Sequence, residues 1–296
     1  MDQARTAVAQ PVPILRYLGV GTNPSHPSIS VDAMLFGDQM DALGDAGYLP
    51  LTVRHLAYAI RSGASLPTRP VLITFDQGLN SFHQYALPAL RYRAMPSTVF
   101  VSTGLVGKQT QSLVGAQAEE RTTMSWRQLE EAASEDVLIG SYGHSQRPLD
   151  LMSRWEAGED LALSRALLEH QLECSVTAMA YPSGLHSSAT RAAAVRVGYT
   201  SACRLGGSVS SNYDDLFSLS RIPIHGGMGP ENLVARLRLE SQTLPTSGER
   251  LRTKARRALR RVVAIGTTES SYARSLVTRG RRPAGWSSDI DSEASG

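Results

Sequence analysis

Cysteine is nearly absent from this sequence, because only Cys174 and Cys203 occur among its 296 residues. Two cysteines cannot form the disulfide network of a small secreted domain, and the lack of a Cys-x-x-Cys pair argues against a structural zinc site. No run of about 18 apolar residues occurs, so the sequence predicts no membrane-spanning helix. The first 20 residues contain neither a continuous apolar segment nor a secretory cleavage pattern, and we therefore expect a cytoplasmic protein.

Positive charge is scarce outside the last part of the chain. Residues 1–249 hold 19 Lys and Arg against 23 Asp and Glu, whereas residues 250–296 hold 11 against 4. The sequence pI of about 9.0 therefore reflects the C-terminal part, and the body is mildly acidic. Because phosphate contacts need clustered cations, we expect no nucleic acid partner on the body of the protein.

Apolar residues make up 42% of the chain and charged residues 19%, which suffices for a large core and excludes wholesale disorder. Strand-like and helix-like patterns alternate along most of the chain. We predict strands at residues 12–18, 71–75, 97–101, 137–139, 176–181, 199–203 and 219–224. We predict helices at residues 30–43, 52–62, 83–92, 126–133, 152–173, 187–197 and 230–239.

Strands separated by helices of about 10–20 residues indicate a parallel sheet covered by helices, and hence a barrel or a doubly wound sheet. In a barrel, the functional groups lie in the loops that follow the strands. The candidate loops are residues 76–80, 140–147, 182–187 and 225–229.

The sequence changes character after about residue 240. Residues 241–266 are predicted to form a basic helical extension, since residues 250–261 contain seven cations and an apolar stripe at helical spacing. Residues 250–261 could bind an anionic membrane surface, a protein partner or nucleic acid, or they could be part of a solvated extension. Residues 267–296 are rich in Ser, Gly and Arg and are predicted to be disordered.

The loop after the first strong strand reads Thr74-Phe-Asp-Gln-Gly78. This motif resembles the signature of polysaccharide deacetylases, the NodB-like carbohydrate esterases. Further segments follow in the order found in that family, namely residues 16–20, 86–90, 95–101, 124–126, 139–141, 180–184 and 221–224. The resemblance covers residues 12–240 and implies one domain with a distorted parallel (β/α) TIM-like barrel.

Members of this family hydrolyse the acetamide of N-acetylated sugars, or sometimes an O-acetyl ester. The resemblance implies a divalent metal, often zinc, that is held by one Asp and two His and activates water. It also implies a second Asp that acts as general base, and Asp76 matches that position.

The sequence departs from the family pattern at each metal ligand. Gln77 replaces the ligand Asp, while Tyr142 and Gln146 replace the two ligand His. Neutral amides and a neutral phenol are poor ligands for zinc, which needs about three protein ligands. We therefore expect no metal cofactor. Other family positions are also changed, with Leu18 for His, Ala180 for Arg and Ser183 for Tyr.

Several roles remain open for the residues of these loops. Asp76 is a candidate general base, or a polar residue that orients its loop. Gln77, Tyr142 and Gln146 are candidates for binding sugar hydroxyls, or they record drift in an inactive site. The segment after the fourth long strand, Tyr181, Pro182 and Ser183, either shapes a groove or only packs.

The histidines offer an alternative metal site. His144 and His186 are the alternative ligand candidates, together with His83 or with His225, which is also a candidate catalytic residue. Their spacing does not match a known metal motif, so a loop histidine without a ligand role is the competing interpretation for each.

Two functions follow from this reading. The first is a carbohydrate-binding relative of the deacetylases, with an acetylated sugar as its partner and with metal-dependent hydrolysis lost or weakened. The alternative is an active carbohydrate deacetylase with one divalent metal such as zinc and a site rebuilt around Asp76. A third possibility is a metal-free reaction in which Asp76 is the base.

Overall fold

The computed structural model describes residues 9–22, 30–110, 113 and 119–242. Residues 243–296 lie outside this part, so the predicted basic extension and disordered tail stay predictions.

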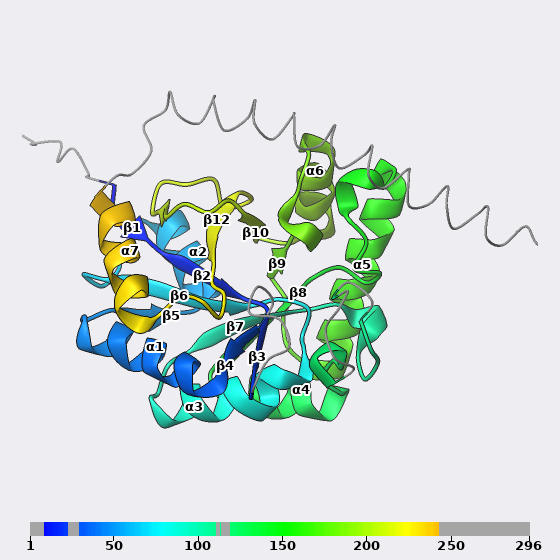
Figure 1. Cartoon of the computed structure of the whole chain (residues 1–296). Coiled ribbons are helices and arrows are strands. Elements are labelled where there is room, and N and C mark those ends of the chain that lie inside the picture. Colours follow the sequence, from blue (N-terminus) through cyan, green and yellow to red (C-terminus); the bar gives the residue numbers. More distant parts are fainter. Residues whose placement is uncertain (1–8, 23–29, 111–112, 114–118, 243–296) are drawn as a thin grey trace, which may run out of the picture. The chain divides into compact units, whose positions relative to one another are not determined.

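Seven parallel strands form a closed barrel, in agreement with the prediction (Figure 1). They are β2 (Ile14–Tyr17), β6 (Pro70–Phe75), β7 (Ser97–Val101), β8 (Val137–Ser141), β9 (Ala178–Ala180), β10 (Ser201–Leu205) and β12 (Leu219–Pro223). Neighbouring strands pair in the order β2, β12, β10, β9, β8, β7, β6, and the pairing of β6 with β2 closes the ring. The closure distinguishes this fold from a doubly wound open sheet.

Five short strands of the described part lie outside the ring. They are β1 (Pro11–Val12), β3 (Gly19–Gly21), β4 (Ser30–Asp32), β5 (Leu49–Leu51) and β11 (Ser210–Ser211). The pairing of β5 with the first residues of β6 is parallel, as is that of β3 with β4, whereas β1 and β11 are antiparallel. Most of them were not predicted, because two or three residues carry too little periodicity to be recognised.

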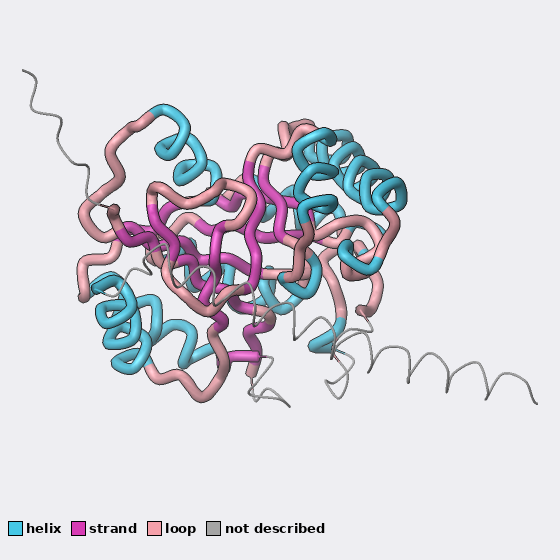
Figure 2. Tube along the Cα trace, turned by 90° about the horizontal axis from the view of Figure 1, so that it is seen from above, coloured by secondary structure: helices cyan, strands magenta, loops and turns pink. Residues whose placement is uncertain are grey.

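Helices connect and cover the strands, as Figure 2 shows for both sides of the barrel. The α-helices are α1 (Ala33–Asp45), α2 (Val53–Ser62), α3 (Leu87–Tyr92), α4 (Trp126–Ala133), α5 (Arg154–Leu172), α6 (Ser188–Val197) and α7 (Pro230–Gln242). Short 3₁₀ turns cover Thr103–Leu105, Glu119–Arg121, Leu149–Leu151 and Pro182–Gly184. A π-helical turn, Phe82–Ala86, precedes α3 within the predicted 83–92 helix.

Local capping explains most helix starts. Ser125 and Gln128 form the predicted capping box of α4, in which each side chain bonds the other residue's backbone N–H. The start of α1 differs from the prediction, because Asp32 rather than Ser30 accepts from the first N–H groups. Ser30 instead belongs to β4.

The apolar side chains form two layers, because successive residues of a strand point to opposite faces. The barrel interior holds residues such as Ile14, Leu72, Phe100 and Leu219, together with Val53 and Leu56 of α2. The layer between strands and helices holds residues such as Leu15, Ile73, Val99 and Ile222. By this alternation, Arg16 shares the inward side of β2 with Ile14, and Arg221 shares the inward side of β12 with Leu219.

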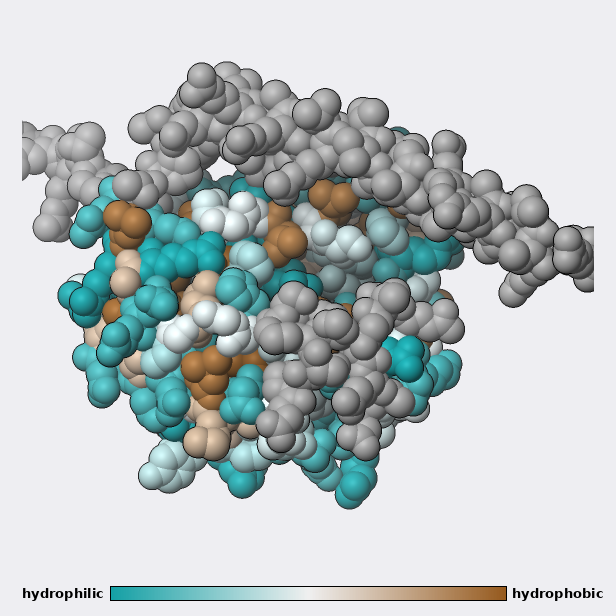
Figure 3. Space-filling model, viewed as in Figure 1, coloured by the Kyte–Doolittle hydropathy of each residue, from teal (hydrophilic) through white to brown (hydrophobic). Residues whose placement is uncertain are grey.

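The face seen in Figure 3 is largely hydrophilic, with separate small hydrophobic areas between polar residues. Among the helices of the described part, none has the length and apolar character needed to cross a bilayer.

Candidate functional site

The predicted loops meet at one end of the barrel. Asp76 follows β6, Tyr142 follows β8, Tyr181 follows β9, and His225 lies in the segment after β12. Parallel strands of a barrel all end on the same side, so these residues come from one rim.

Asp76 lies at the centre of a buried ion cluster. Its side chain is 1% exposed, and Arg221 contacts both carboxylate oxygens, with Nη1–Oδ1 at 2.5 Å and Nη2–Oδ2 at 3.0 Å. Arg16 adds a third bond from Nε to Oδ2 at 2.7 Å. The Asp76 backbone N–H donates to the Tyr17 carbonyl at 3.1 Å, which fixes the residue at the end of β6.

The cluster keeps Asp76 ionised. Burial alone would raise the pKa of its carboxyl, but the charges and hydrogen bonds of Arg221 and Arg16 outweigh burial and lower that pKa below its ordinary value. A carboxylate stabilised in this way is a weak proton acceptor, because its affinity for a proton falls with its pKa.

Arg221 is fixed by three kinds of contact. Its side chain is 1% exposed, and beyond Asp76 its Nη1 donates to Thr74 Oγ1 at 3.3 Å. The guanidinium carbon lies 5.3 Å from the centre of the Phe100 ring, which is a cation–π contact inside the barrel. The guanidinium therefore fills the interior at its carboxyl end.

Neither arginine was singled out from the sequence. A signal was present, because Arg16 and Arg221 are each the one charged residue of a strand whose other residues are uncharged and mostly apolar. An arginine at such a position needs a buried anion, and Asp76 was the acid already placed at that end of the barrel.

Gln77 has a backbone conformation that is uncommon for its residue type. Its φ is 73°, and the following Gly78 has a φ of 66°, so the chain turns through two successive left-handed residues. The Gln77 side chain is buried, with 6% of the residue exposed. The residue matched to the family's acidic metal ligand is thus a neutral amide within the protein.

Tyr142 links the loop after β8 to the turn after β9. Its hydroxyl oxygen accepts from the Ser183 backbone N–H at 3.2 Å, and its own N–H donates to the Val101 carbonyl at 2.8 Å. Burial first, and then the charge of Asp76, raise the pKa of Tyr142 to about 12. The phenol is therefore neutral near pH 7 and lacks the anionic oxygen that would bind zinc.

Gln146 also has a positive φ, of 62°. Its Oε1 accepts from Thr110 Oγ1 at 2.7 Å, whereas its Nε2 is buried with no acceptor among the described residues. Asp160 of α5 shapes the preceding loop, because its carboxylate accepts from the backbone N–H groups of His144 at 2.8 Å and Ser145 at 2.9 Å.

The segment from Tyr181 to Ser183 has mixed surroundings. Tyr181 is fully buried in the layer between strands and helices, and its hydroxyl donates to the Phe217 carbonyl at 3.1 Å. Pro182 is also buried, whereas Ser183 is exposed with a φ of 59°. The contacts of Tyr181 are those of a packing residue, and the predicted substrate contacts of all three stay predictions.

The candidate histidines occupy separate environments. His144 Nδ1 lies 3.0 Å from Thr103 Oγ1, and the ring of His186 stacks on Tyr181 with centres 4.7 Å apart. His225 is exposed in the loop after β12.

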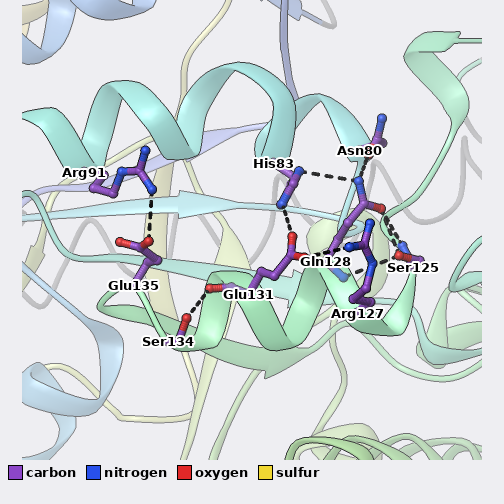
Figure 4. Close-up of polar contacts among 9 residues, drawn as sticks. All are labelled: Asn80, His83, Arg91, Ser125, Arg127, Gln128, Glu131, Ser134 and Glu135. Atoms are coloured by element: carbon purple, nitrogen blue, oxygen red, sulfur yellow. Dashed lines mark hydrogen bonds and ion pairs between the residues drawn. The ribbon is translucent and has the colours of Figure 1, made fainter.

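His83 belongs to the π-helical turn on the outer side of the barrel, and its side chain points toward α4 (Figure 4). Its Nε2 is 2.8 Å from Glu131 Oε2, and its Nδ1 is 3.4 Å from Gln128 Nε2. Gln128 Nε2 also donates to Asn80 Oδ1 at 2.7 Å, so this network ties the loop after β6 to the start of α4. These contacts account for His83 without a metal.

The residues at this rim do not fit a divalent metal. The three matched positions are neutral, and the Asp76 carboxylate is paired with two arginines whose charge opposes a cation. Within the described ranges, no group of three or more His, Cys, Asp and Glu is arranged to hold a metal ion.

A hollow of about 850 Å³ lies elsewhere, at the amino ends of the strands. Its lining includes Arg54 and His55 of α2, Val137 at the start of β8, and Cys174. It contains none of the predicted site residues.

Comparison with known proteins shows which family this chain resembles. Residues 63–202 match the family described as polysaccharide deacetylase. The Bacillus subtilis (strain 168) protein YxkH, whose name places it provisionally among the polysaccharide deacetylases, is 24% identical over 217 residues, which are 73% of this chain and 72% of YxkH. The chain is therefore similar to polysaccharide deacetylases over these residues.

Two solved structures show a similar fold. The Streptococcus pyogenes deacetylase PplD, in complex with acetate, is 25% identical with a TM-score of 0.68, covering 78% of this chain and 99% of PplD. IcaB from Ammonifex degensii shares the fold at 22% identity and a TM-score of 0.68, covering 77% of this chain and 97% of IcaB. The matched span 63–202 includes Asp76 and Tyr142, but Arg16 and Arg221 lie outside it.

Proposed function

We propose that this polysaccharide-deacetylase-like protein binds an acetylated carbohydrate at the carboxyl end of its barrel and has lost, or strongly weakened, metal-dependent hydrolysis. The proposal rests mainly on the carboxylate of Asp76, whose two oxygens accept three hydrogen bonds from Arg221 and Arg16. Such a carboxylate accepts a proton poorly, and its two arginines oppose the approach of a cation.

The neutral residues support binding without hydrolysis. Gln77, Tyr142 and Gln146 replace the acidic and imidazole ligands with amide and phenol groups. Without a metal, water keeps a pKa near 15.7 rather than about 7, so amide hydrolysis lacks its nucleophile at neutral pH. Amides and phenols are instead suited to donate to and accept from sugar hydroxyls.

Metal content and acetate release test the proposal together. The purified chain, incubated with excess zinc, cobalt or nickel and then desalted, should retain well under one equivalent by elemental analysis. It should release no acetate from N-acetylated chito-oligosaccharides, while calorimetry detects their binding. A stoichiometric metal, with acetate release that a chelator abolishes, would establish the alternative of an active deacetylase with a rebuilt site.

A variant with the family's ligands restored provides the positive control. The triple substitution Gln77→Asp, Tyr142→His and Gln146→His should raise bound zinc toward one equivalent, because it returns one carboxylate and two imidazoles. If this variant folds and still retains no zinc, the alignment of the 140–149 loop with the family motif is wrong.

A further inference from the structure

The ion cluster of Asp76, Arg16 and Arg221 at the rim has one more positive than negative charge. Arg16 and Arg221 contribute two positive charges, and Asp76 contributes one negative charge. The nearby Tyr142 phenol and Cys203 thiol are both neutral near pH 7, since burial is the main cause that raises each pKa to about 12. The cluster therefore has a net charge of +1.

Arg221 by itself satisfies Asp76. It binds both oxygens in the forked geometry that is the strongest arrangement for a guanidinium and a carboxylate. Arg16 adds only its Nε, on an oxygen that already accepts from Arg221. Neutralising Asp76 thus does not explain why a second arginine is placed inside the barrel.

The terminal nitrogens of Arg16 are available to a ligand. No acceptor in the described part of the chain is bonded to Nη1 or Nη2, and the side chain keeps 20% of its surface exposed. The four N–H donors of these two nitrogens therefore have no acceptor among the described residues, on a side chain that is four-fifths buried. A partly buried cation without a full set of partners favours an anion from outside.

We propose that Arg16 is an anion-binding residue of the carbohydrate site, and that the sugar recognised there carries a single carboxylate, as a uronic acid does. This proposal rests on the proposed carbohydrate-binding function. A carboxylate fits because its charge of −1 balances the excess of +1, and because its two oxygens match the planar fork of a guanidinium.

A matched pair of disaccharides tests the proposal. Glucuronyl-N-acetylglucosamine carries one carboxylate, whereas N,N′-diacetylchitobiose is neutral. Calorimetry with the full chain at low salt should give tighter binding of the acidic disaccharide by about tenfold, and added salt should reduce that preference. The same calorimetric measurement is made with two further ligands, acetate alone and a singly sulfated N-acetylated disaccharide.

Arg16→Met removes the charge while keeping a side chain of similar length. It should weaken binding of the acidic disaccharide by about tenfold, as expected for a lost charge-assisted hydrogen bond, and leave chitobiose within about twofold. Arg127→Met is the matched control, because Arg127 is a solvent-exposed residue of α4 with the same charge. It should change neither affinity. Arg16→Lys should retain part of the preference, since it keeps the charge without the fork.

Each outcome is decisive. Equal binding of the two disaccharides, or an unchanged preference in Arg16→Met, overturns the acidic-sugar proposal and leaves the carbohydrate-binding function intact. Acetate binding as tight as the disaccharide, or a preference for the sulfated sugar, overturns the uronic acid assignment. If neither sugar binds, the proposed function itself fails. Should Arg16→Met not fold, the wild-type comparison and Arg16→Lys still decide.

Discussion

At the scale of single residues, the contacts of Asp76 are the most informative feature of the site. The family resemblance implies the role of general base, which stays a prediction, and the contacts of Asp76 make it the anion of a buried cluster with Arg221 and Arg16. Removing one partner of a buried ion pair leaves the others without compensation, and this destabilises a protein more than the pair as a whole stabilises it.

We therefore predict that Asp76→Asn lowers the free energy of unfolding by about 3 kcal/mol, because two arginines lose their counter-ion. Urea denaturation followed by circular dichroism measures the change. Asp41→Asn is the control, since Asp41 pairs with Arg93 at the surface and should change stability by less than about 1 kcal/mol. A loss at Asp76 no larger than at Asp41 would contradict the buried-cluster interpretation.

The pH dependence of stability follows from the same group. Because the folded pKa of Asp76 lies below its ordinary value of 3.8, its contribution is fully present above that value. The contribution decreases as the pH falls below about 3.8 and is lost once the pH passes the folded pKa. The stability difference between wild type and Asp76→Asn should thus be constant from pH 6 to 8 and shrink toward pH 3. A constant difference down to pH 3 would argue against this titration.

At the scale of elements, the close approach of neighbouring strands and their side chains limits which residues a barrel strand can contain. A Cβ on Gly140 of β8 would lie 2.7 Å from the Phe100 ring and 2.9 Å from the Ala178 carbonyl oxygen. Phe100 in turn lies under the Arg221 guanidinium, so the packing of β8 and the ion cluster are connected.

Gly140→Ala should therefore destabilise the protein by about 1–3 kcal/mol through overpacking. Gly158→Ala is the matched control on α5, where a new Cβ meets nothing within 4 Å. That substitution should stabilise by about 0.5–1 kcal/mol, since alanine is the better helix former. Thermal denaturation of both variants checks the pair. Equal effects of the two changes would mean that the interior tolerates an extra methyl group.

At the scale of the whole molecule, the barrel contains its own core. The buried residues of both apolar layers lie between Val12 and Leu237, and the ring closes through β2 and β6 without later residues.

Truncation after Ser247 should accordingly leave the midpoint of thermal unfolding within about 2 °C of the full chain, because no part of the described core is removed. Differential scanning calorimetry compares the two forms. A drop of about 5 °C or more would reveal stabilising contacts between residues 250–261 and the barrel.

The sequence by itself determined the order and type of the long elements. Periodicity and capping residues are local, and so β7 and α4 begin and end where predicted. The motif at residues 74–78 and the segments after it indicated the barrel, which the closed ring of strands confirmed. The sequence also showed neutral residues at the positions matched to the family's metal ligands, because residue identity by itself determines ligand chemistry.

Only the tertiary structure decided what surrounds Asp76. Arg16 and Arg221 are separated from it by 60 and 145 positions in the chain, and ring closure alone brings β2, β6 and β12 together. The same holds for the Tyr142 hydroxyl, which accepts from a backbone group 41 residues away. Whether a carboxylate serves as a base or as a counter-ion depends on its neighbours in space, and pairing between distant strands sets those neighbours.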